Sequence, residues 1–146
     1  MARFSTGTRT GAGSTTLPII SLYSSATVNA RIREIGIFNT TTTAVALKLT
    51  RLTSTGTQGG GLTETSHDAT GGTAACTAFG THTVAPTLGG DLGYNVVLGA
   101  AAGAGVIFTF GSDTGLATAV GTANGVGVIV ATGTGQICDA YIVWDE

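Results

Sequence analysis

Gln136-Ile-Cys-Asp-Ala-Tyr-Ile-Val-Trp144 is the stretch that decides the fold, and Asp145 and Glu146 follow it directly. Its apolar residues alternate between two faces, with Ile142 and Trp144 on one and Ile137, Tyr141 and Val143 on the other. This alternation is typical of a strand whose two faces are both largely covered. Because loose chain ends are usually polar and frayed, we predict that the segment is a central strand that pairs late, and that the two acidic residues form its solvated end.

The composition favours a single domain with a nearly neutral surface. A chain of 146 residues can bury roughly 68 to 70% of its unfolded surface, which is enough for one core. Only 10% of the residues are charged, against about 25% in a typical domain, and 24 are glycine. Glycine inside a strand costs about 0.5 to 1 kcal/mol relative to alanine, and partner subunits can offset that cost. We therefore predict a homo-oligomer.

Charge and hydropathy argue against two classes of partner. The formal net charge is −2, so the chain has no basic field that would attract nucleic acid. Residues 1–16 lack the apolar segment of a secretory signal. The longest apolar run, residues 96–110, is interrupted by glycine and is shorter than the roughly 20 residues that span a membrane. We expect neither a nucleic acid nor a membrane as partner.

Short strand-like segments begin after residue 16. Residues 17–23 open the ordered region, and residues 28–38 follow with a shift of apolar parity that predicts a bulge near Arg33-Glu34. Residues 45–49 alternate apolar with polar side chains, which predicts a half-buried strand paired with the preceding one as a hairpin.

The second half has the pattern of a meander. Residues 106–110 are followed by a turn at 111–115 and a strand at 116–120. Asn124-Gly125 predicts a type I′ hairpin turn before the alternating strand 126–130. No segment has a helical period. Turns every 8 to 12 residues or so indicate an all-β fold, which we predict to be an antiparallel β-sandwich of jelly-roll-like or Greek-key topology.

Two segments lie outside this strand pattern. Residues 1–16 contain Arg3, Phe4 and Arg9 among Ser, Thr and Gly without any period, and we predict a flexible N-terminal arm. Residues 17–146 then form the sandwich domain, with a long Gly- and Thr-rich loop at about 53–75. Loops of that length are usually functional or disordered, and this one would suit contact with a neighbouring subunit.

Several short motifs look catalytic or metal-binding but favour ordinary turns. Asp113-Thr-Gly115 spells the aspartic protease triplet, yet Gly111-Ser112 precede it instead of a buried strand, and the same letters are common in turns. Ser66-His-Asp68 are adjacent, whereas a catalytic triad comes from separate elements. The possible zinc ligands lack CxxC or HxxxH spacing; they are His67, Asp68, Cys76 and His82. We predict no enzyme activity, no metal and no cofactor.

The two cysteines, Cys76 and Cys138, are too few for a disulfide scaffold. Cys138 alternates with apolar residues of the closing strand, which favours a buried free thiol. The sequence does not decide whether the two cysteines form a disulfide bond with each other.

Four stretches resemble small virion proteins of tailed bacteriophages, and the resemblance runs from about Ile32 to the end of the chain. They are Arg33-Glu-Ile-Gly-Ile-Phe-Asn-Thr-Thr-Thr-Thr-Ala44, Arg51-Leu-Thr53, Gly121-Thr-Ala-Asn-Gly-Val-Gly127 and Gly133-Thr-Gly-Gln-Ile-Cys-Asp-Ala-Tyr-Ile-Val-Trp-Asp-Glu146. The resemblance implies a capsid decoration (cement) protein, commonly a β-sandwich trimer seated on the head lattice. It implies the major capsid protein as partner, the virion capsid surface as location and assembly in the host cytoplasm. Phage tail and fibre proteins share the Gly and Thr bias, so a tail or receptor-binding module, with glycans as one class of ligand, is the alternative.

In that role the arm and the closing strand would have separate tasks. Arg3, Phe4 and Arg9 would contact the capsid, because arginine forms charge-assisted hydrogen bonds with carboxylates. Tyr141, Val143 and Trp144 would serve the core or a seam between subunits.

Overall fold

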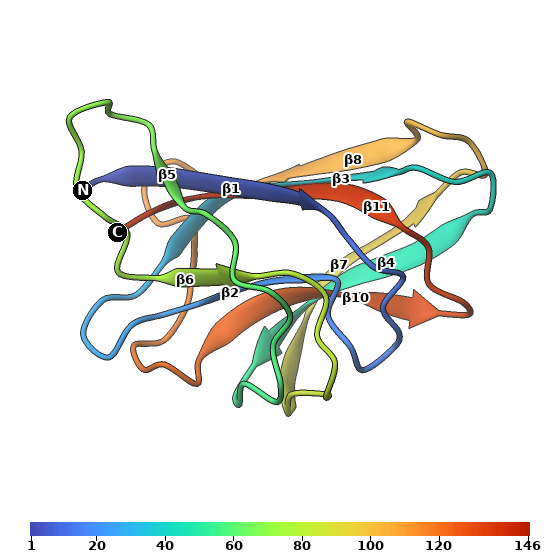
Figure 1. The fold of residues 1–146 in the computed structure, drawn as a ribbon, viewed down its shortest axis with the longest axis horizontal. Helices are drawn as coiled ribbons and strands as arrows, with labels where there is room; N and C mark the ends of the chain where they lie inside the picture. The colour runs from blue at the N-terminus through green and yellow to red at the C-terminus, as the bar shows by residue number, and fades with distance from the viewer.

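The computed structural model describes the whole chain, Met1–Glu146, as two antiparallel β-sheets packed face to face (Figure 1). This confirms the predicted all-β sandwich. The strands in chain order are β1 (Arg3–Arg9), β2 (Ile20–Tyr23), β3 (Arg31–Asn39), β4 (Val45–Leu52), β5 (Thr65–Ser66), β6 (Thr77–Phe79), β7 (Leu88–Leu98), β8 (Gly105–Thr109), β9 (Leu116–Ala117), β10 (Gly125–Thr132) and β11 (Cys138–Asp145).

The strand order is that of a rolled antiparallel ribbon. Strands β1, β2, β3 and β4 pair in turn with β11, β10, β8 and β7. Pairing of β11 with β3 and of β10 with β4 then joins the ribbon into two sheets. We call them the β11 sheet, with order β5-β1-β11-β3-β8 and β9 beside β3, and the β10 sheet, with order β6-β2-β10-β4-β7. This connectivity is jelly-roll-like.

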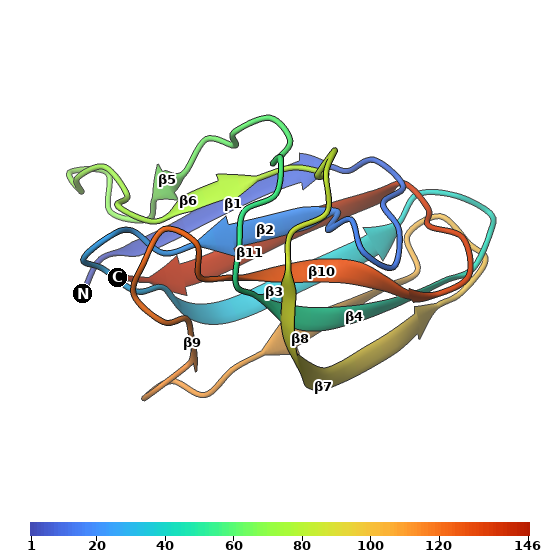
Figure 2. The same cartoon turned by 90° about the horizontal axis from the view of Figure 1, so that it is seen from below.

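The closing strand β11 is central, as its alternation predicted. It lies between β1 and β3 (Figure 2). Ile142 and Trp144 are buried between the sheets, while Tyr141 and Val143 lie on the outer face. The predicted bulge is also confirmed, because Val143 pairs with Glu34 and Trp144 pairs with Ile32, which leaves Arg33 as the extra residue.

The core between the sheets contains both thiols. It consists of 21 buried apolar residues, and Cys76 and Cys138 are among them. Both cysteines are free and fully buried, as the sequence favoured, and burial raises the pKa of the Cys76 thiol to about 12 and that of Cys138 to about 11. Neutral thiols of this kind behave as small apolar side chains.

The prediction of a flexible N-terminal arm is wrong for residues 3–9, which form β1. This strand pairs with β11 along its whole length, from Arg3 opposite Asp145 to Arg9 opposite Asp139. Its anchor is Phe4, which is 2% exposed and stacks on Trp144 with ring centroids 5.9 Å apart. The alternation of buried and open residues exists in β1, but small Thr and Gly side chains hide it in the sequence.

The predicted hairpin of β3 with β4 is also wrong, because these strands belong to different sheets. Asn39 redirects the chain between them. Its amide nitrogen donates to the carbonyl oxygens of Thr43 and Gly99 at 2.7 and 3.0 Å, and its amide oxygen accepts the Thr41 N–H at 2.9 Å. These bonds turn the chain across the sandwich, where a tight hairpin would have kept it in one sheet.

Asn124-Gly125 is no type I′ turn. Only glycines have positive φ in this structure, and neither Asn124 nor Gly125 does. The turn lies earlier, where the Asn124 N–H donates to Gly121 O at 2.9 Å. Gly125 begins β10, and a Cβ at this position would lie 2.9 Å from Cδ1 of Tyr23, so its requirement for glycine is close packing.

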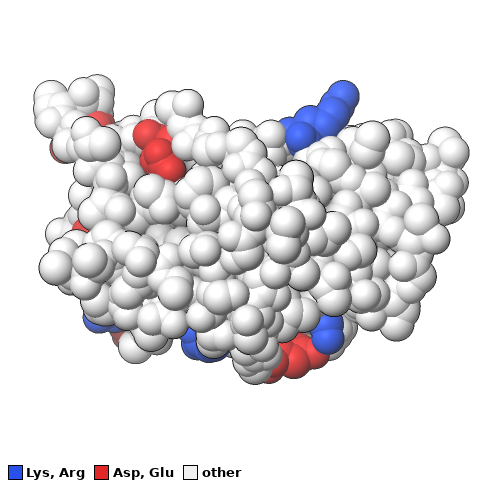
Figure 3. Space-filling model, turned by 60° about the horizontal axis from the view of Figure 1, so that its bottom comes forward, with Lys and Arg blue, Asp and Glu red and all other residues white.

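The first part of the long loop, residues 53–61, lies over the protein's own β10 sheet, whereas β5 further along pairs with β1 at the edge of the β11 sheet. Tyr23 donates its hydroxyl to Ser54 O at 3.1 Å, and His82 bonds Ser21 Oγ at 2.8 Å. A bridge between Thr57 and Val84 ties the two covering segments, residues 53–61 and 80–87, to each other. Figure 3 shows this loop-covered side as an almost uncharged surface, with charged residues at its rims.

Candidate functional site

The outer face of the β11 sheet is the candidate binding face. In contrast to the β10 sheet, no long loop extends over its middle (Figure 1), although the turn at residues 111–115 reaches its margin, where Arg33 Nη1 donates to Gly111 O and Ser112 O. It carries four of the six basic residues and three of the eight acidic residues. From the strand registers, its larger side chains are Arg3 and Arg9 of β1, Asp139, Tyr141, Val143 and Asp145 of β11, Arg31, Arg33, Glu34 and Phe38 of β3, and Ile107 of β8.

One end of this face is a buried carboxylate held by two arginines. The Asp145 carboxylate accepts bonds from Arg3 Nε at 2.7 Å, Arg3 Nη2 at 3.1 Å and Arg33 Nε at 2.6 Å. The expected solvated end is therefore wrong for Asp145, whose side chain is only 8% exposed. The hydrogen bond from Arg3, with that from Arg33, holds the pKa of Asp145 below its usual value. Arg33 is 11% exposed, whereas Arg3 is 51% exposed and can reach a partner.

An aromatic strip crosses the middle of the face. Tyr141 lies over Gly36 of the neighbouring strand, where any side chain would collide with its ring. Its hydroxyl donates to the Glu34 carboxylate, and its ring stacks on Phe38 with centroids 6.5 Å apart. Burial, together with the bond to Glu34, raises the pKa of Tyr141 to about 12. The Tyr141 side chain is thus uncharged and held in one orientation on the face.

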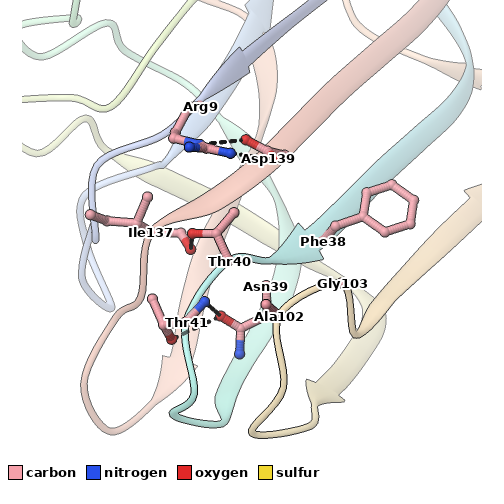
Figure 4. Close-up of a pocket in the computed structure, with 9 residues that line it drawn as sticks. All are labelled: Arg9, Phe38, Asn39, Thr40, Thr41, Ala102, Gly103, Ile137 and Asp139. Carbon is pink, nitrogen blue, oxygen red and sulfur yellow. Dashed lines mark hydrogen bonds and ion pairs between the residues drawn. The ribbon is translucent and has the colours of Figure 1, made fainter.

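The other end of the face has an exposed ion pair beside a shallow hollow (Figure 4). Arg9 donates to Asp139 through Nε and Nη2 at 2.9 and 3.0 Å, and the two side chains are 69% and 50% exposed. The hollow has a volume of about 470 Å³ and is lined by Arg9, Phe38, Asn39, Thr40, Thr41, Ala102, Gly103, Ile137 and Asp139. An aromatic ring, an aliphatic side chain and a bidentate ion pair give it a mixed character, suited to a small polar ligand with one apolar face.

The structure separates the residues that the sequence proposed as sites. Arg3 and Arg9 lie on the binding face, but Phe4 is buried in the core and cannot contact a partner. Tyr141 and Val143 lie on the same face, half-buried, whereas Trp144 is a core residue with no exposed surface.

Sequence reasoning missed the acidic half of this face. Arg3 and Arg9 are six residues apart, and so are Asp139 and Asp145. An antiparallel pairing of the two segments brings both opposite charges together at once, as it does in the structure. That matched spacing was the available signal. The bulge that lets Arg33 reach Asp145 was predicted, but not its role.

The motifs rejected in the sequence lie in turns and in the core. Asp68 accepts bonds from the Thr70 N–H and hydroxyl, both at 2.9 Å, and so closes a turn. Gly115 has φ of +59° and ends the turn that contains Asp113. His82 is buried against Ser21. No group of three or more His, Cys, Asp or Glu side chains is placed to hold a metal ion.

Comparison with protein-family models, with curated proteins and with solved structures gives no match to this chain. The structure has no helix long and apolar enough to cross a membrane.

Proposed function

We propose that this protein is a non-enzymatic structural protein of a phage virion, a capsid decoration protein that binds the outer head lattice through the outer face of its β11 sheet. The observation that carries the proposal is the difference between the two sides of the sandwich. One side is covered by the chain's own loops, while the other holds two ion pairs whose Arg3 and Arg9 side chains are more than half exposed, with an aromatic strip between them. The resemblance to small phage virion proteins supplies the class of partner.

The chemistry of the face suits many weak contacts. Arg3 and Arg9 are more than half exposed and retain free N–H donors, so carboxylates of a capsid protein can join the existing pairs. Tyr141, Phe38 and Val143 between them offer apolar area. Exposed ion pairs are individually worth about 0 to 1 kcal/mol, but contacts repeated across several capsid subunits multiply in effect. A bound layer of this kind would resist the outward pressure of packaged DNA.

The test compares two matched ion pairs on opposite sheets. The double variant Arg9→Ala/Asp139→Ala removes the exposed pair from the binding face. The control Lys48→Ala/Asp91→Ala removes an equivalent pair, 3.0 Å apart, from the β10 sheet. In a co-sedimentation assay with purified capsids, we expect the first variant to bind at least about tenfold more weakly, which corresponds to about 1.4 kcal/mol. The control should bind like the wild type.

Two results would refute the proposal. Equal capsid binding by both double variants would exclude the β11 sheet face, and cryo-microscopy that finds the protein only in tails would exclude the head. Deletion of residues 1–16 would remove β1 from the sheet, so it would perturb the fold together with any capsid contact.

The hollow at the end of the face favours a second candidate, a tail or receptor-binding module that binds glycans. Phe38 of β3 lines the hollow together with Asp139, its partner on β11, and Arg9, which lies one strand further on (Figure 4), and an aromatic ring with polar planar groups suits the apolar and polar faces of a sugar. A glycan array would decide this candidate. Binding to defined glycans that is lost in Phe38→Ala would support it, and an array without any signal would exclude it.

A further inference from the structure

One long edge of the sandwich has short strands covered by a loop, and the other is open. On one edge the strands β5 and β6 are two and three residues long. The loop before β5 covers this edge: Leu62 N–H donates to Ala78 O at 2.9 Å, and the Ala78 N–H donates to the Glu64 carboxylate at 2.9 Å. On the opposite edge, β7 and β8 have one paired strand each and nothing beyond them.

The outward backbone groups of β8 can be identified from the bonds at its two ends. Asn39 N–H donates to Ala104 O at 2.7 Å, and Phe110 N–H donates to Arg33 O at 2.9 Å. Residues that bond a neighbouring antiparallel strand alternate along the chain. The even-numbered residues of β8 therefore bond β3, and Gly105, Ile107 and Thr109 direct their N–H and C=O groups away from the sheet.

This edge lacks the devices that usually prevent edge pairing. Proteins protect edge strands with charged residues, proline or bulges, but β8 contains none of these and pairs with β3 in unbroken register. Ile107 is 50% exposed at its centre. On the opposite, inner side of β8, Tyr94 of β7 packs edge-to-face on Phe108 and Phe110, with centroids 5.6 and 5.2 Å apart, and remains 39% exposed.

We infer that the β8 edge pairs with β8 of a second copy of this chain, antiparallel and with Ile107 on a two-fold axis. Gly105 of each copy then lies opposite Thr109 of the other, and each outward residue exchanges both of its backbone bonds across the axis. The strand is self-complementary in this register. Gly105 and Thr109, the small residues on the same face as Ile107, lie opposite each other across the axis, and no like charges meet because β8 has no charged residue. The β11 sheets of both copies become one continuous sheet.

This pairing closes on itself and gives a dimer, in contrast to the trimer that the phage resemblance implies. It depends on the geometry of the edge and not on the proposed capsid role. A strand from a different protein is the competing occupant, and it would leave the isolated chain monomeric.

The first experiment measures the mass of the full chain by light scattering after size exclusion, over a wide concentration range. We expect twice the 14.4 kDa subunit mass. Ile107→Lys places a charge on the edge and should raise the dimer dissociation constant at least tenfold. The matched control Val84→Lys alters a similarly exposed residue, 55% open, in a loop over the β10 sheet, and should leave it unchanged. Circular dichroism of each variant checks that the subunit is folded.

A second variant tests the symmetry itself. Ile107→Cys puts a thiol beside the axis, so mild oxidation should cross-link most of the protein into a covalent dimer, whereas Val84→Cys should remain monomeric on a non-reducing gel. The native thiols are fully buried and do not compete. A monomeric or trimeric wild type, association of Ile107→Lys as tight as the wild type, or equal cross-linking of the two cysteine variants would overturn the inference.

Discussion

Replacement of Trp144 by alanine should unfold the subunit, and not merely separate subunits. The indole has no exposed surface, stacks on Phe4 at 5.9 Å and donates its N–H to the Glu146 carboxylate at 3.2 Å. Truncation of a buried Trp to Ala typically costs about 3 to 5 kcal/mol. The lost hydrogen bond is a small part of this, because the Glu146 carboxylate keeps the N–H donors of Ala75 and Cys76 at 2.5 and 3.0 Å.

The effect is large enough to measure by two independent methods. For a chain of this size, each kcal/mol shifts the melting temperature by about 2 to 4 °C, so Trp144→Ala should melt at least about 6 °C lower. Urea unfolding should show the same loss as a lower midpoint with an unchanged slope. Trp144→Phe keeps an aromatic ring against Phe4 and should lose less than half as much.

The contrary result is equally definite. If Trp144→Ala lost less than about 1.5 kcal/mol of unfolding free energy while its mass fell to that of the monomer, the indole would be an interface residue and not a core residue. Val143→Ala is the matched control, because it alters the adjacent residue on the outer face. Its unfolding free energy should change by about 1 kcal/mol or less, as expected for partly exposed positions.

Three further predictions follow from buried polar groups. Asp145→Asn should cost about 3 kcal/mol in urea unfolding, because it leaves the largely buried Arg33 without a charged partner; a loss below 1 kcal/mol would contradict this. Burial lowers the pKa of His82 below its ordinary 6.5, so on acidification the unfolded chain binds the proton before the folded one does. The unfolding free energy should therefore fall as the pH drops below about 7. A flat pH profile in the wild type, or the same fall in His82→Gln, would contradict this. Cys76 and Cys138, with pKa raised to about 12 and 11, should react with a thiol reagent at pH 8 only after denaturation, and rapid reaction of the native protein would count against their burial.

The sequence predicted most strands but few of their partners. Alternation identifies a strand and its buried face locally, which is why β11 and the bulge at Arg33 of β3 were predictable. Pairing is set by the whole chain, and here successive strands repeatedly cross between the sheets, so the hairpin rules that assume neighbours in sequence failed for β3 with β4 and for Asn124-Gly125. The hydrogen bonds of Asn39 turn the chain from one sheet to the other. An asparagine followed by threonines also suits a hairpin turn, so the sequence does not distinguish the two.

The candidate site was predictable only in part, for a related reason. Arg3 and Arg9 stood out because charge is rare in this chain, but the absence of large apolar residues around Phe4 gave the segment the composition of a disordered arm. One buried aromatic ring and the matched acidic residues of β11 outweigh that composition. The hollow, by contrast, forms where loops from distant parts of the chain meet, and no local pattern predicts it.

The β8 pairing has a consequence for capsid binding that can be measured. Residues directly opposite each other in a sheet point to the same side, so a two-fold axis at Ile107 places the outer faces of both β11 sheets side by side. A dimer would then present two binding faces together to a repeating lattice, and the second contact would form at a high effective concentration. Ile107→Lys, which leaves the ion pairs and the aromatic residues of each face intact, should therefore weaken capsid binding by more than tenfold, and Val84→Lys should not. If Ile107→Lys is monomeric yet binds capsids as tightly as the wild type, the two faces act independently and dimerisation has no role in attachment.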